Sequence, residues 1–208
     1  MGSELRSVWR AFHYEALWQM SWMRLNLILA LLPVVGAVIL YFGWRRLSIL
    51  RWPLLMATGL LLPNAPYVVT DLIHLPGAIR YAPSAVYVWA GVLPLFSCLI
   101  TTGVLSYAFT LHLMRKALRA RGWSRRRRVV VEAVVGSLCA LGVALGRISR
   151  LNSWDVVHPS RLWSGLTTVS LDVRAEVLSL IIVLLAGVVV DWAASGAAHS
   201  LRDRVHHR

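Results

Sequence analysis

The stretch LLLPNAPYVVTDLIHLP, residues 60–76, lies inside an apolar run that is long enough to cross a membrane. It places two prolines close together, Pro63 and Pro66, and follows them with Asp71 and His74. Each proline lacks a backbone N–H and disfavours helical geometry at the residue before it. The stretch therefore predicts a membrane-spanning helix that breaks near its middle, with polar groups on the half that follows.

The composition of the whole chain is that of a membrane protein. Hydrophobic residues make up 58% of the 208 residues and charged residues only 15%, which is not typical of a soluble domain of this length. Crossing hydrocarbon about 30 Å thick takes roughly 20 apolar residues in a helix. Five runs approach or reach that length, namely 25–44, 52–75, 85–114, 129–146 and 175–198. We therefore expect an all-α, polytopic bundle of about five spans, forming one transmembrane domain over residues 25–198, with a basic tail at residues 199–208.

The segment before the first span, residues 1–24, has neither the clean apolar core nor the cleavage site of a signal peptide. Apolar residues recur along it at helical spacing, at Trp9, Phe12, Ala16, Leu17 and Met20. This pattern predicts an amphipathic helix lying on the membrane surface.

The net charge of +13 would suggest nucleic acid in a soluble protein, but here the basic residues gather at span ends. The first and third loops and the tail hold 14 of the 22 Lys and Arg residues, including the run SRRRR at residues 124–128. The positive-inside rule then places the N-terminus outside and the C-terminus inside. We interpret the run as an orientation signal that also contacts anionic lipid headgroups, and we expect no nucleic-acid partner.

Asn64 stands between the two prolines and is a plausible N-cap for the half-helix that restarts there. A broken helix leaves backbone carbonyls that hydrocarbon cannot satisfy, so the break must face protein or a water-filled cavity. We therefore expect Asn64 in a polar cavity between helices.

On the restarted half-helix, Tyr67, Thr70, Asp71 and His74 fall at i, i+3, i+4 and i+7, which forms one polar stripe. An aspartate within a span costs on the order of 2.5 to 3.5 kcal/mol on insertion scales, so Asp71 must find a cation or a proton. The alternative is that Asp71 and His74 lie at the headgroup level and cap a loop.

A second polar motif, GRISRLNSWD at residues 146–155, leaves the fourth span on the same outer side as this stripe. Arg147, Arg150 and Trp154 share a helical face if that helix continues past Gly146. The arginines could then neutralise Asp71, Asp155 or an anionic ligand, because a guanidinium matches carboxylate and phosphate geometry. We predict that Asp71 lies within ion-pair reach of Arg147 or Arg150. The alternative is an ordinary span ending with snorkelling arginines and an interfacial tryptophan.

Two D-x-x-H pairs, Asp71 with His74 and Asp155 with His158, could together supply four ligands to a zinc ion. Two-residue pairs are weak indications of a metal site, so we expect no metal and no other cofactor. An Asp and a His near arginines also suit acid–base chemistry or proton-coupled transport.

Other residues of the spans predict structural contacts. Glu132 follows Arg128 by four residues, which suits an ion pair at the inner surface. The G-x-x-x-G of Gly142 and Gly146 predicts close packing of the fourth span. Asp191, deep in the fifth span, is a further candidate for a functional residue.

Three stretches, LPNAPYVVTDLIHL, RLNSWD and RLNLILALLPV, resemble the bacterial predicted membrane proteins of the domain-of-unknown-function family numbered 1361. The resemblance implies a polytopic fold in a bacterial cytoplasmic membrane and supplies no activity. By resemblance, the family's signature positions are Asn64, Asp71, His74, Arg150, Asn152, Trp154 and Asp155.

Three classes of function remain open. The first is the transport or handling of a small anionic solute, an ion or a lipid headgroup. Its candidate ligand-binding residues are Asn64, Tyr67, Asp71, His74, Arg147, Arg150, Asn152, Trp154 and Asp155. The second is a membrane-embedded enzyme with Asp71 and His74 as catalytic acid–base groups, although no nucleophile elbow, phosphate loop or zinc-protease helix is present. The third is an assembly or chaperone subunit that contacts other membrane proteins.

Overall fold

The computed structural model describes residues 21–170, which form helices and connecting loops without any strand in that range. Three helical stretches there are long and apolar enough to cross a membrane, namely Trp22–Gly43, Ala85–Ala120 and Arg125–Ile148. They correspond to the first, third and fourth predicted spans, so the predicted all-α membrane-helix bundle is confirmed for this part of the chain. The fifth predicted span with Asp191, the tail and nearly all of the surface segment lie outside the described residues.

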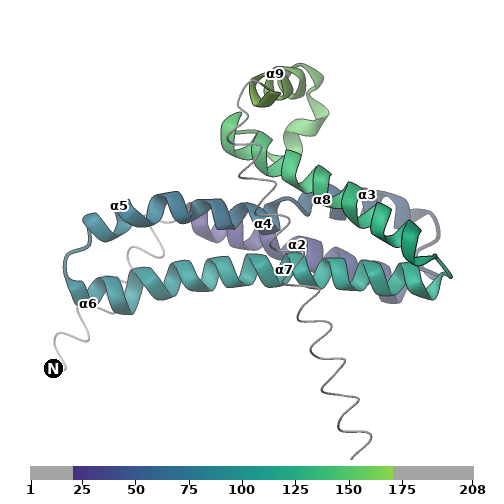
Figure 1. The fold of residues 1–208 in the computed structure, drawn as a ribbon, viewed down its shortest axis with the longest axis horizontal. Coiled ribbons are helices and arrows are strands. Elements are labelled where there is room, and N and C mark those ends of the chain that lie inside the picture. The colour runs from purple at the N-terminus through teal and green to yellow at the C-terminus, as the bar shows by residue number, and fades with distance from the viewer. Residues whose placement is uncertain (1–20, 171–208) are drawn as a thin grey trace, which may run out of the picture.

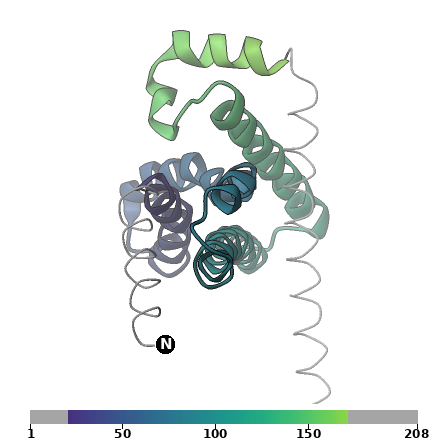
Figure 2. The ribbon, with the colours of Figure 1, turned by 90° about the vertical axis from the view of Figure 1, so that its left-hand side faces the viewer.

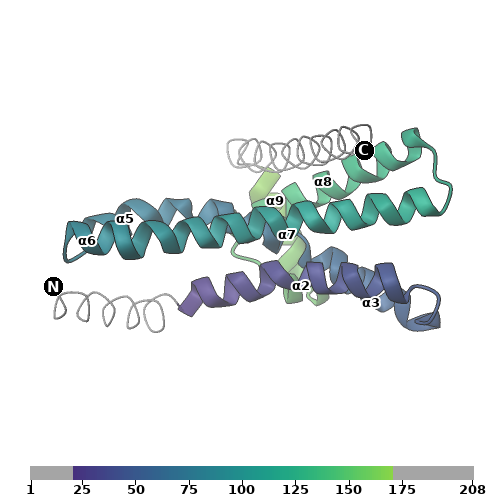
Figure 3. The ribbon, with the colours of Figure 1, turned by 90° about the horizontal axis from the view of Figure 1, so that it is seen from below.

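The helical elements lie side by side and alternate in direction along the bundle (Figures 1 and 3). In chain order they are α2 (Ser21–Gly43), η2 (Ser48–Leu50), α3 (Arg51–Leu61), α4 (Asn64–Tyr67), η3 (Val68–His74), α5 (Leu75–Arg80), α6 (Ala85–Tyr87), η4 (Val88–Val92), α7 (Leu93–Ala120), α8 (Arg125–Ile148), η5 (Ser153–Val157) and α9 (Pro159–Ser170). Helix α2, the run from α3 to α5 and helix α7 form the body of the bundle, and α8 crosses it obliquely. Helix α9 lies across the bundle axis beyond α8 (Figure 2).

The predicted break of the second span is confirmed at Leu62 and Pro63, between α3 and α4. The break is local, because Leu62 (φ −56°, ψ −38°) and Pro63 (φ −58°, ψ −24°) both keep right-handed helical dihedrals. The missing N–H groups of Pro63 and Pro66 interrupt the hydrogen-bond ladder without turning the chain aside.

The predicted role of Asn64 as an N-cap is wrong. Pro63 occupies the cap position, and the Asn64 side chain donates hydrogen bonds where a cap would accept one. Its Nδ2 lies 2.9 Å from the carbonyl oxygen of Leu61 and 2.9 Å from Oγ of Ser153. Asn64 thus satisfies a carbonyl at the break, because the backbone N–H of Ala65 bonds to Leu62 instead, at 3.1 Å.

The restarted half begins with one α-helical turn, α4, and continues as a 3₁₀ helix, η3, where the sequence predicted an α-helix throughout. With three residues per turn, residues i and i+3 eclipse each other, so the predicted single stripe divides into two rows. Tyr67 and Thr70 form one row, and Asp71 and His74 form the other. Thr70 and Asp71 are buried, whereas His74 is exposed.

Glycines let α7 and α8 close on the break from two sides. A Cβ on Gly103 of α7 would lie 2.5 Å from the carbonyl oxygen of Ala65, and one on Gly142 of α8 would lie 2.7 Å from the ring of Pro63. Both approaches are too close for any larger residue. The close packing predicted for the fourth span is confirmed, and its partner is the broken second span.

Both basic loops lie at one end of the bundle. The Arg121 guanidinium carbon is 4.2 Å from the Trp44 ring centroid, which joins the loop after α7 to the loop after α2. Nearby, Glu132 pairs with Arg115 of α7 at 2.8 Å, so the predicted partner Arg128 is wrong. The predicted orientation requires the two basic loops to lie on the same side of the membrane, and their position at one end of the bundle agrees with this. The side of the membrane that these loops face stays a prediction.

Candidate functional site

Asp71 is a buried carboxylate in which each oxygen has a partner. The residue is 1% exposed. Nη2 of Arg147 lies 2.9 Å from its Oδ1, and Nδ2 of Asn26 donates to its Oδ2 at 2.9 Å. The predicted ion pair is confirmed, with Arg147 as the partner. It ties η3 to α8 and to the first turns of α2.

Arg147 is held by several contacts besides Asp71. It stands in the last turn of α8, where a cation interacts favourably with the helix dipole. Its Nε lies 3.0 Å from Oγ1 of Thr70, and Nη2 donates to the same hydroxyl. Its guanidinium carbon lies 4.8 Å from the Tyr67 ring centroid. These contacts immobilise the Arg147 side chain.

Arg150 does not share a helical face with Arg147, and this prediction is wrong. Helix α8 ends at Ile148, and Arg150 takes a left-handed backbone conformation with φ +52° as the chain turns back toward α4. Its side chain is exposed and forms no ion pair with any residue in the range 21–170. Arg150 is thus a cation without an acidic partner in the described chain.

The loop after α8 is fixed by Asp155, a second buried carboxylate. The backbone N–H of Asn152 donates to its Oδ2 at 2.8 Å, and Arg161 of α9 pairs with its Oδ1. The hydrogen bond from Asn152 and the charge of Arg161 outweigh desolvation and lower the pKa of the Asp155 carboxyl below its ordinary 3.8. Trp154, which precedes Asp155 in the chain, is 53% exposed. Asp155 therefore orders this loop.

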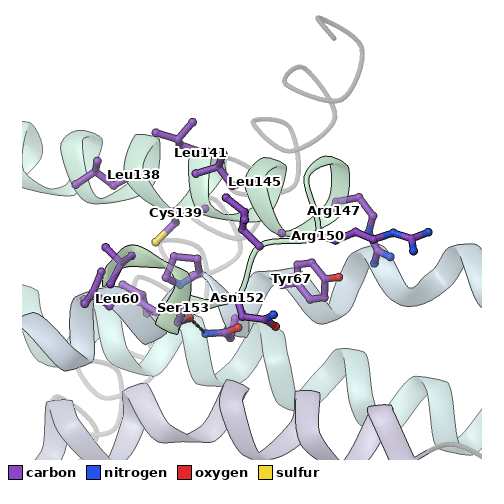
Figure 4. A pocket seen from close by; sticks show the side chains of 18 of the residues that line it. Leu60, Tyr67, Leu138, Cys139, Leu141, Leu145, Arg147, Arg150, Asn152 and Ser153 are labelled. Atoms are coloured by element: carbon purple, nitrogen blue, oxygen red, sulfur yellow. Dashed lines mark hydrogen bonds between the residues drawn. The ribbon is translucent and has the colours of Figure 1, made fainter. Parts of the chain in front are cut away.

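A cleft of about 830 Å³ lies between the α3–α4 break and α8, within the usual size range of small-molecule sites. We call it the break cleft. The two arginines stand at one end with Tyr67, and Leu60, Leu138 and Cys139 stand at the other (Figure 4). Its polar lining residues are Asn26, Asn64, Tyr67, His74, Arg147, Arg150, Asn152 and Ser153. Asn64 therefore lines a cavity between helices, as expected, but most of the lining of this cavity is apolar, not polar.

The break cleft gathers most of the predicted ligand-binding residues. Six of them line it: Asn64, Tyr67, His74, Arg147, Arg150 and Asn152. Asp71 lies behind Arg147, and Trp154 and Asp155 are not part of the lining. Two polar lining residues, Asn26 and Ser153, were not predicted. A signal for Asn26 was available, because it is a lone amide near the start of an apolar span.

The four weak candidate metal ligands, Asp71, His74, Asp155 and His158, do not come together in the described residues. Within residues 21–170, no three His, Cys, Asp or Glu side chains come together. The carboxylates of Asp71 and Asp155 are each paired with an arginine. His74 instead packs on Trp22, with ring centroids 5.0 Å apart.

Comparison with known proteins identifies the family and no more. Residues 25–190 match the family described as "Protein of unknown function (DUF1361)". The chain belongs to this family. No curated protein and no solved structure matches it.

Proposed function

We propose that this protein binds a small anionic ligand at the polar end of the break cleft and handles or transports it at the membrane. The observation that carries the proposal is Arg150, a cation that lines the cleft without an acidic partner in the described residues. The amide side chain of Asn152 lines the same cleft and can donate hydrogen bonds, whereas the side-chain N–H groups of Asn64 are already bonded to Leu61 and Ser153. Broken helices at such sites are common in transporters, which supports the same class.

The geometry favours ligand binding over the enzyme alternative. A catalytic base must reach its substrate, but Asp71 is 1% exposed, does not line the cleft and is paired with Arg147 and Asn26. The assembly alternative accounts for the Asp71 contacts, which join three helices. It gives no role to Arg150, so we assign structure to Asp71 and ligand binding to Arg150.

A thermal-shift experiment on the full chain in zwitterionic nanodiscs tests this function. Phosphate, sulfate and acetate are added at constant ionic strength, and a bound anion raises Tm because it stabilises only the folded state. We expect a shift that Arg150→Asn abolishes. Arg80→Gln is the matched control, because Arg80 is an exposed arginine outside the break cleft. The absence of any Arg150-dependent shift, for these anions and for longer anionic esters, would overturn the proposal.

We also propose that the polar end of the cleft faces the outside of a bacterial cytoplasmic membrane. Asn26 lies near the start of α2, whereas the basic loops lie beyond its other end, at Gly43. The positive-inside rule places those loops in the cytoplasm. Reporter fusions at Gly122 and Ser160 test the orientation, and cytoplasmic activity at Ser160 would reverse it.

A further inference from the structure

The end of the break cleft away from the arginines is lined by hydrocarbon side chains. They come from α3 on one wall and from α8 on the other: Met56, Leu60, Val135, Leu138 and Leu141. Several are open to their surroundings, with Met56 69% exposed and Leu138 59% exposed. This apolar lining and the polar end belong to one continuous cavity.

The break cleft is elongated along α8. Its α8 wall extends from Val135 to Arg147, which is about 18 Å at 1.5 Å per residue. A hydrocarbon chain is far thinner than a helix and can lie along such a cavity.

The direction of the cleft determines how an amphiphile would lie in it. Its polar end lies near the start of α2, at Asn26, and is farther from the basic loops than its apolar end is. Its apolar end extends along α3 from the break toward Met56. The chain of an amphiphile whose anionic headgroup lies at Arg150 would therefore run between α3 and α8 toward the basic loops.

From this geometry we propose that the ligand is a single-chain anionic amphiphile, such as an alkyl phosphate. The phosphate lies against Arg150, and the chain lies between α3 and α8. The proposal rests on the proposed function and deepens it by naming the ligand class. A free phosphate and the headgroup of an amphiphile share the same chemistry, but a free phosphate needs only the polar end of the cleft. The two ligands can therefore be distinguished by whether a chain strengthens binding.

Two glycines permit a matched test of the chain site. A Cβ added to Gly59, which lines the apolar end, has no atom within 4 Å, and the same is true of Gly77, which lies outside the cleft. Gly59→Phe therefore adds a bulky ring at the apolar end without a clash at its Cβ, and Gly77→Phe adds the same side chain elsewhere. Arg150→Asn removes the headgroup cation, and asparagine tolerates the left-handed backbone there. Arg80→Gln is again the charge control.

The experiment measures binding of methyl, butyl, hexyl and octyl phosphate to the full chain in phosphatidylcholine nanodiscs, by calorimetric titration. Each methylene that becomes buried strengthens binding by up to about fourfold, so we expect octyl phosphate to bind at least tenfold more tightly than methyl phosphate. Gly59→Phe should abolish this gain without weakening methyl phosphate, and Gly77→Phe should leave it intact. Arg150→Asn should weaken every ester, and Arg80→Gln should weaken none.

The outcomes separate this inference from the proposed function. If methyl phosphate binds through Arg150 but chain length adds nothing, the cleft takes a free anion or another occupant fills its apolar end, and the amphiphile proposal is overturned alone. If Gly59→Phe leaves the chain-length gain unchanged, the chain lies elsewhere and the proposal is likewise overturned. If no ester depends on Arg150, both proposals are overturned together.

Discussion

Removing the charge of Asp71 tests whether its ion pair with Arg147 holds the bundle together. The side chains of Asp71 and Arg147 are 2% and 24% exposed, and their nearest atoms are 2.9 Å apart. Two unit charges about 4 Å apart attract by about 4 kcal/mol at an effective dielectric constant of 20. Desolvation offsets much of this attraction, so the measured effect depends on which partner remains.

The two single substitutions should therefore differ in cost. Asp71→Asn keeps the size of the side chain and leaves Arg147 partly solvated, so we expect a loss of about 1.5 to 3 kcal/mol of unfolding free energy. Arg147→Gln leaves a buried carboxylate without its cation, and we expect a loss of about 3 to 5 kcal/mol. The double mutant should lose less than the sum of the two, by about 1 to 3 kcal/mol.

The assay is equilibrium unfolding of the full chain in mixed micelles, followed by circular dichroism. Glu132→Gln is a comparison variant, because the Glu132 carboxylate is 21% exposed in its pair with Arg115 and should cost less. Single-mutant losses that add within about 0.5 kcal/mol would refute the reasoning, since they would show that the two charges do not interact. A neutral Asp71→Asn would refute it as well.

Three further predictions concern the break and the loop after α8. Gly142→Ala should cost about 1 to 3 kcal/mol in thermal or denaturant unfolding, because the added methyl group meets the Pro63 ring. Gly59→Ala adds its methyl group in open space and should be neutral or stabilising by up to about 1 kcal/mol. Equal effects of the two substitutions would contradict the close approach of Gly142 to Pro63. Asn64→Ala should cost about 1 to 3 kcal/mol, because it leaves the part-buried carbonyl of Leu61 at the break without its donor, and an unchanged unfolding midpoint would contradict that role. The lowered pKa of Asp155 means that its carboxylate stabilises the loop above pH 3.8 and that this contribution is lost as the pH falls through the lowered value; hydrogen exchange of the loop amides should accelerate there, and Asp155→Asn should remove the pH dependence.

The features that depend only on residue type and local sequence were predictable from the sequence. Apolar length indicated the described spans, and Pro63 and Pro66 indicated the break. The pairing of Asp71 with an arginine followed from the cost of burying an isolated carboxylate. These predictions needed only the residue type and its depth in a span.

Features that depend on neighbouring helices were not predictable. Asn64 donates to Leu61 and to Ser153, and Ser153 is in reach because the loop after α8 lies against the break. The sequence around Asn64 is equally consistent with an N-cap, so it did not indicate these contacts. Arg150 leaves the helical face because α8 ends at Ile148, and no glycine or proline marks that end. Helix α9 was not predicted, since its 12 residues are too short and polar to indicate a span.

The most direct test of the account is photo-crosslinking with an alkyl phosphate that carries a diazirine at the end of its chain, mapped by mass spectrometry. If the headgroup lies at Arg150 and the chain lies in the break cleft, labels should fall on the facing walls, Met56 to Leu60 of α3 and Val135 to Leu141 of α8. Arg150→Asn should abolish them. Labels spread over lipid-facing residues of α2 and α7, or labels unchanged by Arg150→Asn, would contradict the account.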